Sequence, residues 1–144
     1  MTKLFIGSDH GALELKDNLV AYLKTIKGVE LIDCGTFDTQ SVDYPDIADK
    51  VVKNVLEDVT NLGVLCCGTG IGISIKANRN KGIRAALVYD KFTSQMAKEH
   101  NNANVLCLGG RTTSFDDAKD YISTWLNSNY EGGRHQRRLD KLDS

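Results

Sequence analysis

The sequence predicts a single α/β domain over residues 1–144, a doubly wound, Rossmann-like fold around a five-stranded parallel sheet. Short apolar runs of strand length alternate with segments whose apolar residues recur at helical spacing. No repeat, low-complexity tract or linker interrupts this alternation. Repeated strand–helix units of this length require parallel strands, right-handed crossovers and helices on both faces. We expect the strand order 2-1-3-4-5.

The first half of the chain supplies two strands and two helices. We expect strands at residues 4–8 and 29–33. The helix between them has inward positions at Leu15, Leu19, Tyr22, Leu23 and Ile26. Pro45, the only proline, marks the start of the second helix, because its fixed φ and missing N–H suit a first turn. The buried stripe of that helix is expected to contain Ile47, Ala48, Val51, Val52, Val55 and Val59.

The second half supplies three more strands, expected at residues 62–67, 83–88 and 105–108. A glycine turn opens a third helix that runs to about residue 78. A fourth helix carries Phe92, Met96 and Ala97. The fifth starts after Ser114, a favourable N-cap. Residues 130–144 are expected to form a basic C-terminal tail or helix after the break at residues 132–133.

The glycine turn is the most informative segment of the chain. It reads Cys67-Gly68-Thr69-Gly70-Ile71-Gly72 and joins an apolar strand to a helix. Glycines let the backbone approach a ligand closely, and a helix N-terminus favours negative charge. The turn lacks the last glycine of a dinucleotide fingerprint and the Lys of a nucleotide P-loop. No arginine stands where a cysteine-dependent phosphatase would need one. The alternative is a turn kept only for tight strand–helix packing.

In a doubly wound sheet, ligands bind beyond the carboxyl ends of the strands, where the strand order reverses. That point lies between strands one and three, which end in Asp9-His10 and in Cys67 with its turn. A helix N-terminus favours the thiolate of Cys67, although this residue could also be a small filler at the strand end. Thr69 could bind a substrate oxygen or cap the helix. His10 could be functional or a turn residue.

Three further segments carry candidate residues. His100 and Asn101 stand at a helix C-terminus, where the histidine could be catalytic or a cap. Arg134 and Arg138 are four residues apart, so they share a helix face and could clamp an anion, or form a solvated face. His135 is expected to point elsewhere. Arg111, after strand five, is another candidate anion ligand.

Composition and cysteines limit the function classes. Lys and Arg number 18 against 19 Asp and Glu, a net charge of −1, which gives no basis for nucleic-acid or membrane binding. No apolar run approaches the roughly 20 residues of a membrane span, and the N-terminus lacks a signal-peptide layout, so a cytoplasmic location is expected. The four cysteines show no zinc-ligand spacing, and Cys66 and Cys67 should face opposite sides of the sheet. We expect free thiols, with Cys34 and Cys107 buried.

Five motifs together resemble a known family, the B-type ribose 5-phosphate isomerases, which are grouped with the galactose 6-phosphate isomerase subunits. The resemblance spans essentially the whole chain. The motifs are Ser8-Asp9-His10-Gly11, Asp43-Tyr44-Pro45, Cys67-Gly68-Thr69-Gly70-Ile71-Gly72, Glu99-His100-Asn101-Asn102-Ala103-Asn104 and Tyr130-Glu131-Gly132-Gly133-Arg134-His135-Gln136-Arg137-Arg138.

The resemblance implies a metal-independent aldose–ketose isomerase without cofactor. It also implies a homodimer with sites at the subunit interface, and it leaves open whether dimers pair into tetramers. Cys67 would be the base, and His100 would open the sugar ring with Asn101 beside it. Asp9 and Thr69 would handle hydroxyl protons. The residues expected to bind the enediolate, the sugar or its phosphate are Gly68, Gly70, Ile71, Gly72, Tyr44, His10, Arg111, Arg134 and Arg138. Several of these could come from the partner subunit.

The resemblance favours ribose 5-phosphate as substrate and leaves alternatives. One is an isomerase acting mainly on a hexose 6-phosphate, either allose or galactose 6-phosphate. Another is a sugar-phosphate-binding module without catalysis. A redox protein would need a second thiol to resolve a disulfide, and Cys66 is expected on the wrong face for that role.

Overall fold

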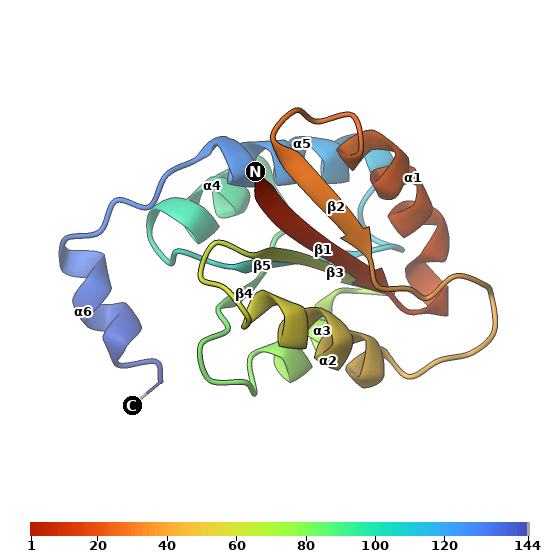
Figure 1. Cartoon of the computed structure of the whole chain (residues 1–144), viewed down its shortest axis with the longest axis horizontal. Coiled ribbons are helices and arrows are strands. Elements are labelled where there is room, and N and C mark those ends of the chain that lie inside the picture. Colours follow the sequence, from red (N-terminus) through yellow and green to blue (C-terminus); the bar gives the residue numbers. More distant parts are fainter. Residues whose placement is uncertain (144) are drawn as a thin grey trace.

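The computed structural model describes residues 1–143 and shows three layers, with a parallel sheet between two layers of helices (Figure 1). The predicted single α/β domain is confirmed. In chain order the elements are β1 (Thr2–Ser8), the 3-10 turn η1 (His10–Ala12), α1 (Leu13–Leu23), β2 (Val29–Asp33), α2 (Tyr44–Val55), β3 (Leu62–Cys67), α3 (Ile71–Ala77), β4 (Ala85–Leu87), α4 (Lys91–Glu99), β5 (Val105–Gly109), α5 (Phe115–Asn127) and α6 (Arg134–Asp140).

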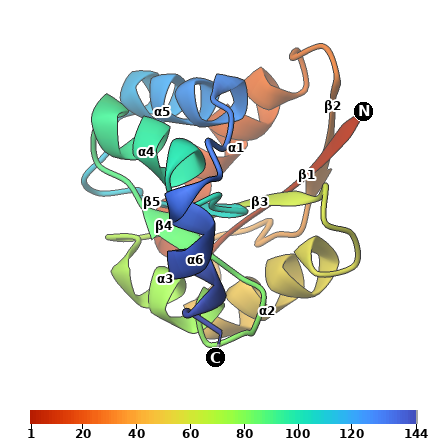
Figure 2. The same cartoon turned by 90° about the vertical axis from the view of Figure 1, so that its left-hand side faces the viewer.

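The two helix layers bury different apolar clusters. Helices α1, α4 and α5 cover one face of the sheet, and α2 and α3 cover the other (Figure 2). Successive side chains of β3 alternate between the two clusters, because side chains of a strand point to opposite faces. Cys66 therefore lies in the first cluster and Cys67 in the second, as expected.

The order of the last two strands differs from the prediction. The sheet has the order β2-β1-β3-β5-β4, so β5 and not β4 lies beside β3. All five residues of β5 are buried, which fits a central strand paired on both sides. The three residues of β4 are only partly buried, which fits an edge. The reversal of order between β1 and β3 is unaffected, and these strands pair with Ser8 opposite Cys66.

Two predicted boundaries are wrong. Helix α2 ends at Val55, so Val59 is fully exposed and is not part of the buried stripe. The side chain of Asp58 accepts a hydrogen bond from the backbone N–H of Thr60 (2.8 Å), and this local turn replaces a further helical turn. Strand β4 is also shorter than the predicted 83–88. Cys107 is buried as expected, whereas Cys34 is only partly buried.

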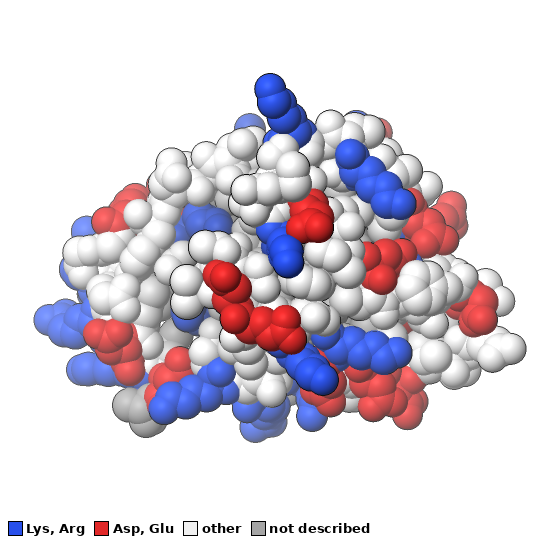
Figure 3. Space-filling view, viewed as in Figure 1, with Lys and Arg blue, Asp and Glu red and all other residues white. Residues whose placement is uncertain are grey.

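Helix α6 lies at one end of the molecule, outside the two helix layers (Figures 1 and 2). Two of its side chains, His135 and Leu139, are buried. Within residues 1–143, no helix combines the length and apolar character needed to cross a membrane. On the face drawn in Figure 3, acidic and basic side chains are interspersed, so that face carries no broad field of one sign.

Candidate active site

The carboxyl ends of three strands meet at one edge of the sheet. The backbone N–H of Asp9, after β1, donates to the carbonyl of Cys66 (3.2 Å). The N–H of Gly110, after β5, donates to the carbonyl of Cys67 (2.8 Å). These contacts bring the segments that carry Asp9, Cys67 and Arg111 together. We call this edge the cysteine edge.

The turn after β3 requires glycine at residue 70. Gly70 has φ of 78°, a conformation that side chains with a Cβ rarely adopt. A Cβ there would lie 2.6 Å from Cδ1 of Leu87 and 2.9 Å from the carbonyl carbon of Leu108. The neighbouring Gly72 lies close to Tyr44, because a Cβ there would be 2.5 Å from the ring of that residue. The predicted turn residues and Tyr44 therefore pack against one another.

Cys67 is the cysteine best placed for chemistry. Its side chain is 4% exposed, and its sulfur accepts a hydrogen bond from the backbone N–H of Gly70 (3.2 Å). The other cysteines are unsuited to ionise. Burial raises the pKa of the Cys66 thiol to about 12, and burial likewise raises the pKa of Cys107 and of Cys34. A nucleophile or base needs a thiolate, so those three are poor candidates for either role.

Arg111 supplies positive charge to the cysteine edge. Its backbone N–H donates to the carbonyl of Gly68 (3.0 Å). Its guanidinium lies between the two strand ends, since a Cβ built at Gly68 would be 3.1 Å from Nη1 and one built at Gly11 would be 3.6 Å from Nη2. An arginine in this position can bind an anion that spans the two loops.

The polar side chains of the same edge are held by local hydrogen bonds. Asp9 caps η1 by accepting from the N–H of Gly11 (3.0 Å). Nδ1 of His10 accepts from the N–H of Val42 (3.2 Å), which leaves Nε2 as the protonated, donating nitrogen of a neutral ring. Oγ1 of Thr69 accepts from the N–H of Ile71 (3.2 Å), so its hydroxyl proton remains available to a ligand.

The remaining candidates form a second group, which we call the histidine edge. A cavity of about 290 Å³ is lined by His100, Asn101, Arg134, His135, Arg138 and Leu139. Arg134 and Arg138 line it together, as their spacing on a helix predicts. His135 lines it too, so the expectation that this residue points elsewhere is wrong. The ring of His135 stacks on His100, with centroids 4.2 Å apart.

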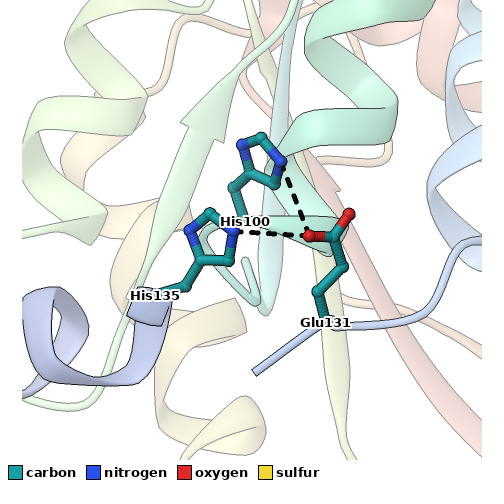
Figure 4. A group of neighbouring side chains, drawn as sticks. All are labelled: His100, Glu131 and His135. Carbon is teal, nitrogen blue, oxygen red and sulfur yellow. Dashed lines mark ion pairs between the residues drawn. The ribbon is translucent and has the colours of Figure 1, made fainter. Parts of the chain in front are cut away.

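One more residue of the histidine edge was not predicted from the sequence. Oε2 of Glu131 lies 3.4 Å from Nε2 of His135 and 3.8 Å from Nε2 of His100 (Figure 4). The four-residue spacing of Glu131 and His135 was a weak signal at most, because two glycines separate them. Only the folded chain shows that both meet His100.

The two edges lie at opposite ends of the strands. The carbonyl of Asn104, in the loop after His100, accepts from the N–H of Gly63 (2.9 Å), at the amino end of β3. Cys67 is at the other end of that strand. Four residues of strand span roughly 13 Å. Figure 1 shows α6 on the side opposite to the arrowheads of β1 and β2. One chain therefore holds the candidate residues in two separate groups.

A larger hollow, of about 470 Å³, contains none of the predicted site residues. Its lining includes Lys27, Arg84 and Lys98. Burial, followed by the neighbouring charge of Arg84, lowers the pKa of Lys98. Among the residues that the structure describes, no carboxylate or thiol lines this hollow, so it lacks those acid–base groups of the two edges.

Comparison with known proteins defines the class first. The chain is 47% identical over 140 residues to a putative sugar phosphate isomerase of Rickettsia bellii, covering 97% of this chain and 96% of that protein. It is 42% identical to ribose-5-phosphate isomerase B of Escherichia coli, covering 99% and 95%. A solved ribose 5-phosphate isomerase of Thermotoga maritima superposes with a TM-score of 0.95 at 47% identity, covering 99% and 97%. The chain is a sugar-phosphate isomerase.

The family assignment is equally direct. The model of the ribose/galactose isomerase family matches residues 4–142, and the chain belongs to that family. The type B ribose 5-phosphate isomerase of Trypanosoma brucei, also solved, has a TM-score of 0.95 at 42% identity, covering 99% of this chain and 98% of that one. The resemblance found in the sequence motifs is confirmed.

Proposed function

We propose that the protein interconverts ribose 5-phosphate and ribulose 5-phosphate through an enediolate, with Cys67 as the base. The observation that carries the proposal is the sulfur of Cys67 beside the glycine turn, with Gly70 N–H directed at it (3.2 Å). The Escherichia coli and Thermotoga maritima relatives are named for ribose 5-phosphate. The cysteine edge offers the base, the N–H donors and a cation that this reaction needs.

The proton transfer follows from those groups. The thiolate of Cys67 removes the proton from C2 of the open-chain aldose, and the electron pair forms a C1–C2 double bond while O1 becomes the anion. Backbone N–H groups of residues 68–72 stabilise this oxyanion. Asp9 and Thr69 move the hydroxyl proton from O2 to O1. The thiol then returns its proton to C1, which leaves the ketose and restores the thiolate.

The histidine edge would prepare and hold the substrate. His100 takes the proton of the anomeric hydroxyl so that the furanose ring opens, and Asn101 lies beside it. Arg134 and Arg138 bind the phosphate with His10 and Arg111, which orients a small flexible sugar. No metal or other cofactor is assigned a step.

The separation of the two edges supports a homodimer. A five-carbon sugar phosphate is too short to reach both edges of one chain, which are roughly 13 Å apart along β3 alone. We propose that the histidine edge of one protomer faces the cysteine edge of its partner, so that each site contains residues of both.

Incubation with ribose 5-phosphate in D₂O, without added metal and followed by proton NMR, tests the reaction. Ribulose 5-phosphate with deuterium at C1 supports the proposal. Conversion of allose or galactose 6-phosphate alone keeps the mechanism and changes the substrate. No conversion of any of the three, with binding retained, makes the protein a sugar-phosphate-binding module.

A further inference from the structure

The cluster of His100, Glu131 and His135 is the one group in residues 1–143 whose residue types could hold a metal ion. Its geometry argues against that use. The two rings are stacked with an interplanar angle of 19° and centroids 4.2 Å apart. The lone pairs of a histidine lie in the plane of its ring, so those of near-parallel rings do not converge on one point. A zinc ion would need to lie about 2.0–2.1 Å from both nitrogens.

The carboxylate of Glu131 can interact with both rings at these longer distances, because an electrostatic contact does not need the convergence that a metal ion requires. Both Nε2 atoms face one oxygen of Glu131 (Figure 4), at 3.4 Å from His135 and 3.8 Å from His100. Nε2 of His135 is buried and has no hydrogen-bond partner within residues 1–143. Oε2 of the Glu131 carboxylate lies 3.4 Å from this nitrogen, within ion-pair distance.

Glu131 is anchored at its backbone and half-exposed at its side chain. Its N–H donates to the carbonyl of Glu99 (2.9 Å), at the end of α4 directly before His100. The preceding Tyr130 donates its hydroxyl proton to Oε1 of Gln136 on α6 (3.0 Å). The side chain of Glu131 is 46% exposed, against 8% for His135. The backbone thus fixes the carboxylate near both rings while the side chain can adjust to a ligand.

We infer that Glu131 is the positioning residue for His100, an inference that rests on the proposed ring-opening role of that histidine. A carboxylate beside Nε2 favours the tautomer with the proton on that nitrogen. Nδ1 is then the basic nitrogen. Stacking on the buried His135 fixes the plane of the ring, so the free lone pair keeps one direction in the cavity that Arg134 and Arg138 also line.

The step that depends on this arrangement is ring opening alone. Nδ1 of His100 takes the proton from O1 of the furanose, the O1–C1 bond becomes a carbonyl and the C1–O4 bond breaks. The imidazolium then gives that proton to O4, which restores the neutral ring. Proton transfer between C2 and C1 belongs to Cys67 and does not involve Glu131. The two steps can therefore be separated by the choice of substrate.

Ribulose 5-phosphate provides that separation, because its O5 carries the phosphate and cannot close a furanose ring on C2. It reaches the enzyme already open. The test compares Glu131→Gln with the wild type and with Glu57→Gln, a control at an exposed carboxylate after α2. Two rates are measured: isomerisation of ribose 5-phosphate, and exchange of C1 hydrogen of ribulose 5-phosphate with D₂O.

Glu131→Gln is expected to lower kcat for ribose 5-phosphate at least about tenfold, since general acid–base assistance is worth about 10²–10⁴-fold. C1 exchange should stay within about twofold of the wild type, because that step uses the cysteine edge. Inhibition by inorganic phosphate should be unchanged. His100→Asn should show the same split between the two rates.

An equal loss of both rates, weaker phosphate inhibition, or no loss in Glu131→Gln would overturn the inference. The inference would also be overturned if Glu131→Gln lost isomerisation but kept C1 exchange while His100→Asn did not separate the two rates. A wild-type protein that catalyses neither reaction would instead overturn the proposed function, whatever the variants do.

Discussion

The cysteine edge and the histidine edge are built in different ways. At the cysteine edge the donors are mostly backbone N–H groups, fixed by strand ends that hydrogen-bond to one another. At the histidine edge the functional groups are side chains. They are brought together by the end of α4, the segment between α5 and α6, and α6 itself. The first arrangement suits the stabilisation of a charge at one fixed point, and the second suits the capture of a flexible phosphate.

The largest expected effect lies at the cysteine edge. Cys67→Ala removes the base and should lower both isomerisation and C1 exchange by at least about 10²-fold. Phosphate inhibition should persist, since the arginines remain. Proton NMR in D₂O measures both rates. The control Cys34→Ala, at a partly buried cysteine away from the turn, should retain the wild-type rates. An active Cys67→Ala would show that proton transfer does not depend on the cysteine edge.

Mixing two variants that are impaired in ribose 5-phosphate isomerisation tests whether the edges of different protomers meet. Cys67→Ala and His100→Asn each damage one edge and leave the other intact. After unfolding together and refolding, random pairing gives about half mixed dimers, each with one intact site of two, so about a quarter of wild-type activity should return. Activity that stays at the sum of the separate variants would show that each protomer forms its own site.

Gly70→Ala tests the rigidity of the cysteine edge. The added Cβ would meet Leu87 and Leu108 at 2.6–2.9 Å in a backbone conformation with φ of 78°. Overpacking costs about 1–3 kcal/mol and the strained conformation about 1–2 kcal/mol. The free energy of unfolding in urea should fall by roughly that sum. Gly132→Ala, with φ of 69° and no atom within 4 Å, should lose only the strain.

Per pH unit, alkaline pH should give the smallest effect on stability. Burial raises the pKa of Cys66 to about 12 in the folded chain, whereas an unfolded cysteine titrates near about 8.5. The stability from the neutral thiol is therefore complete below about pH 8.5 and is lost as pH rises towards the folded value. One such thiol adds a slope of up to about 1.4 kcal/mol per pH unit. Urea titrations between these limits should show a shallower decline for Cys66→Ala than for the wild type.

The sequence predicted the cysteine edge well because that edge follows from local rules. Apolar runs located β1 and β3, and the reversal of strand order placed Asp9 near Cys67. The order of β4 and β5 was wrong because pairing depends on how fully each strand is buried, and that burial is decided by the helices packed on it. Hydrophobic runs of similar length do not carry this information.

The histidine edge was predicted only in part. His100, Arg134 and Arg138 were found through motif and spacing, but Glu131 and the direction of His135 were not. Gly132 and Gly133 both have positive φ, at 69° and 58°, and turn the chain so that α6 returns to the end of α4. A pair of glycines allows many directions, so the sequence alone does not determine which side chains meet beyond them.

The small contact between α6 and the rest of the domain has a consequence for the evolution of substrate specificity. This terminal helix buries only His135 and Leu139, yet it carries both arginines of the expected phosphate clamp. Substitutions there leave the sheet and the glycine turn untouched. Substitutions in α6 can therefore change which sugar phosphate is bound, and how long it can be, while the residues of proton transfer stay the same.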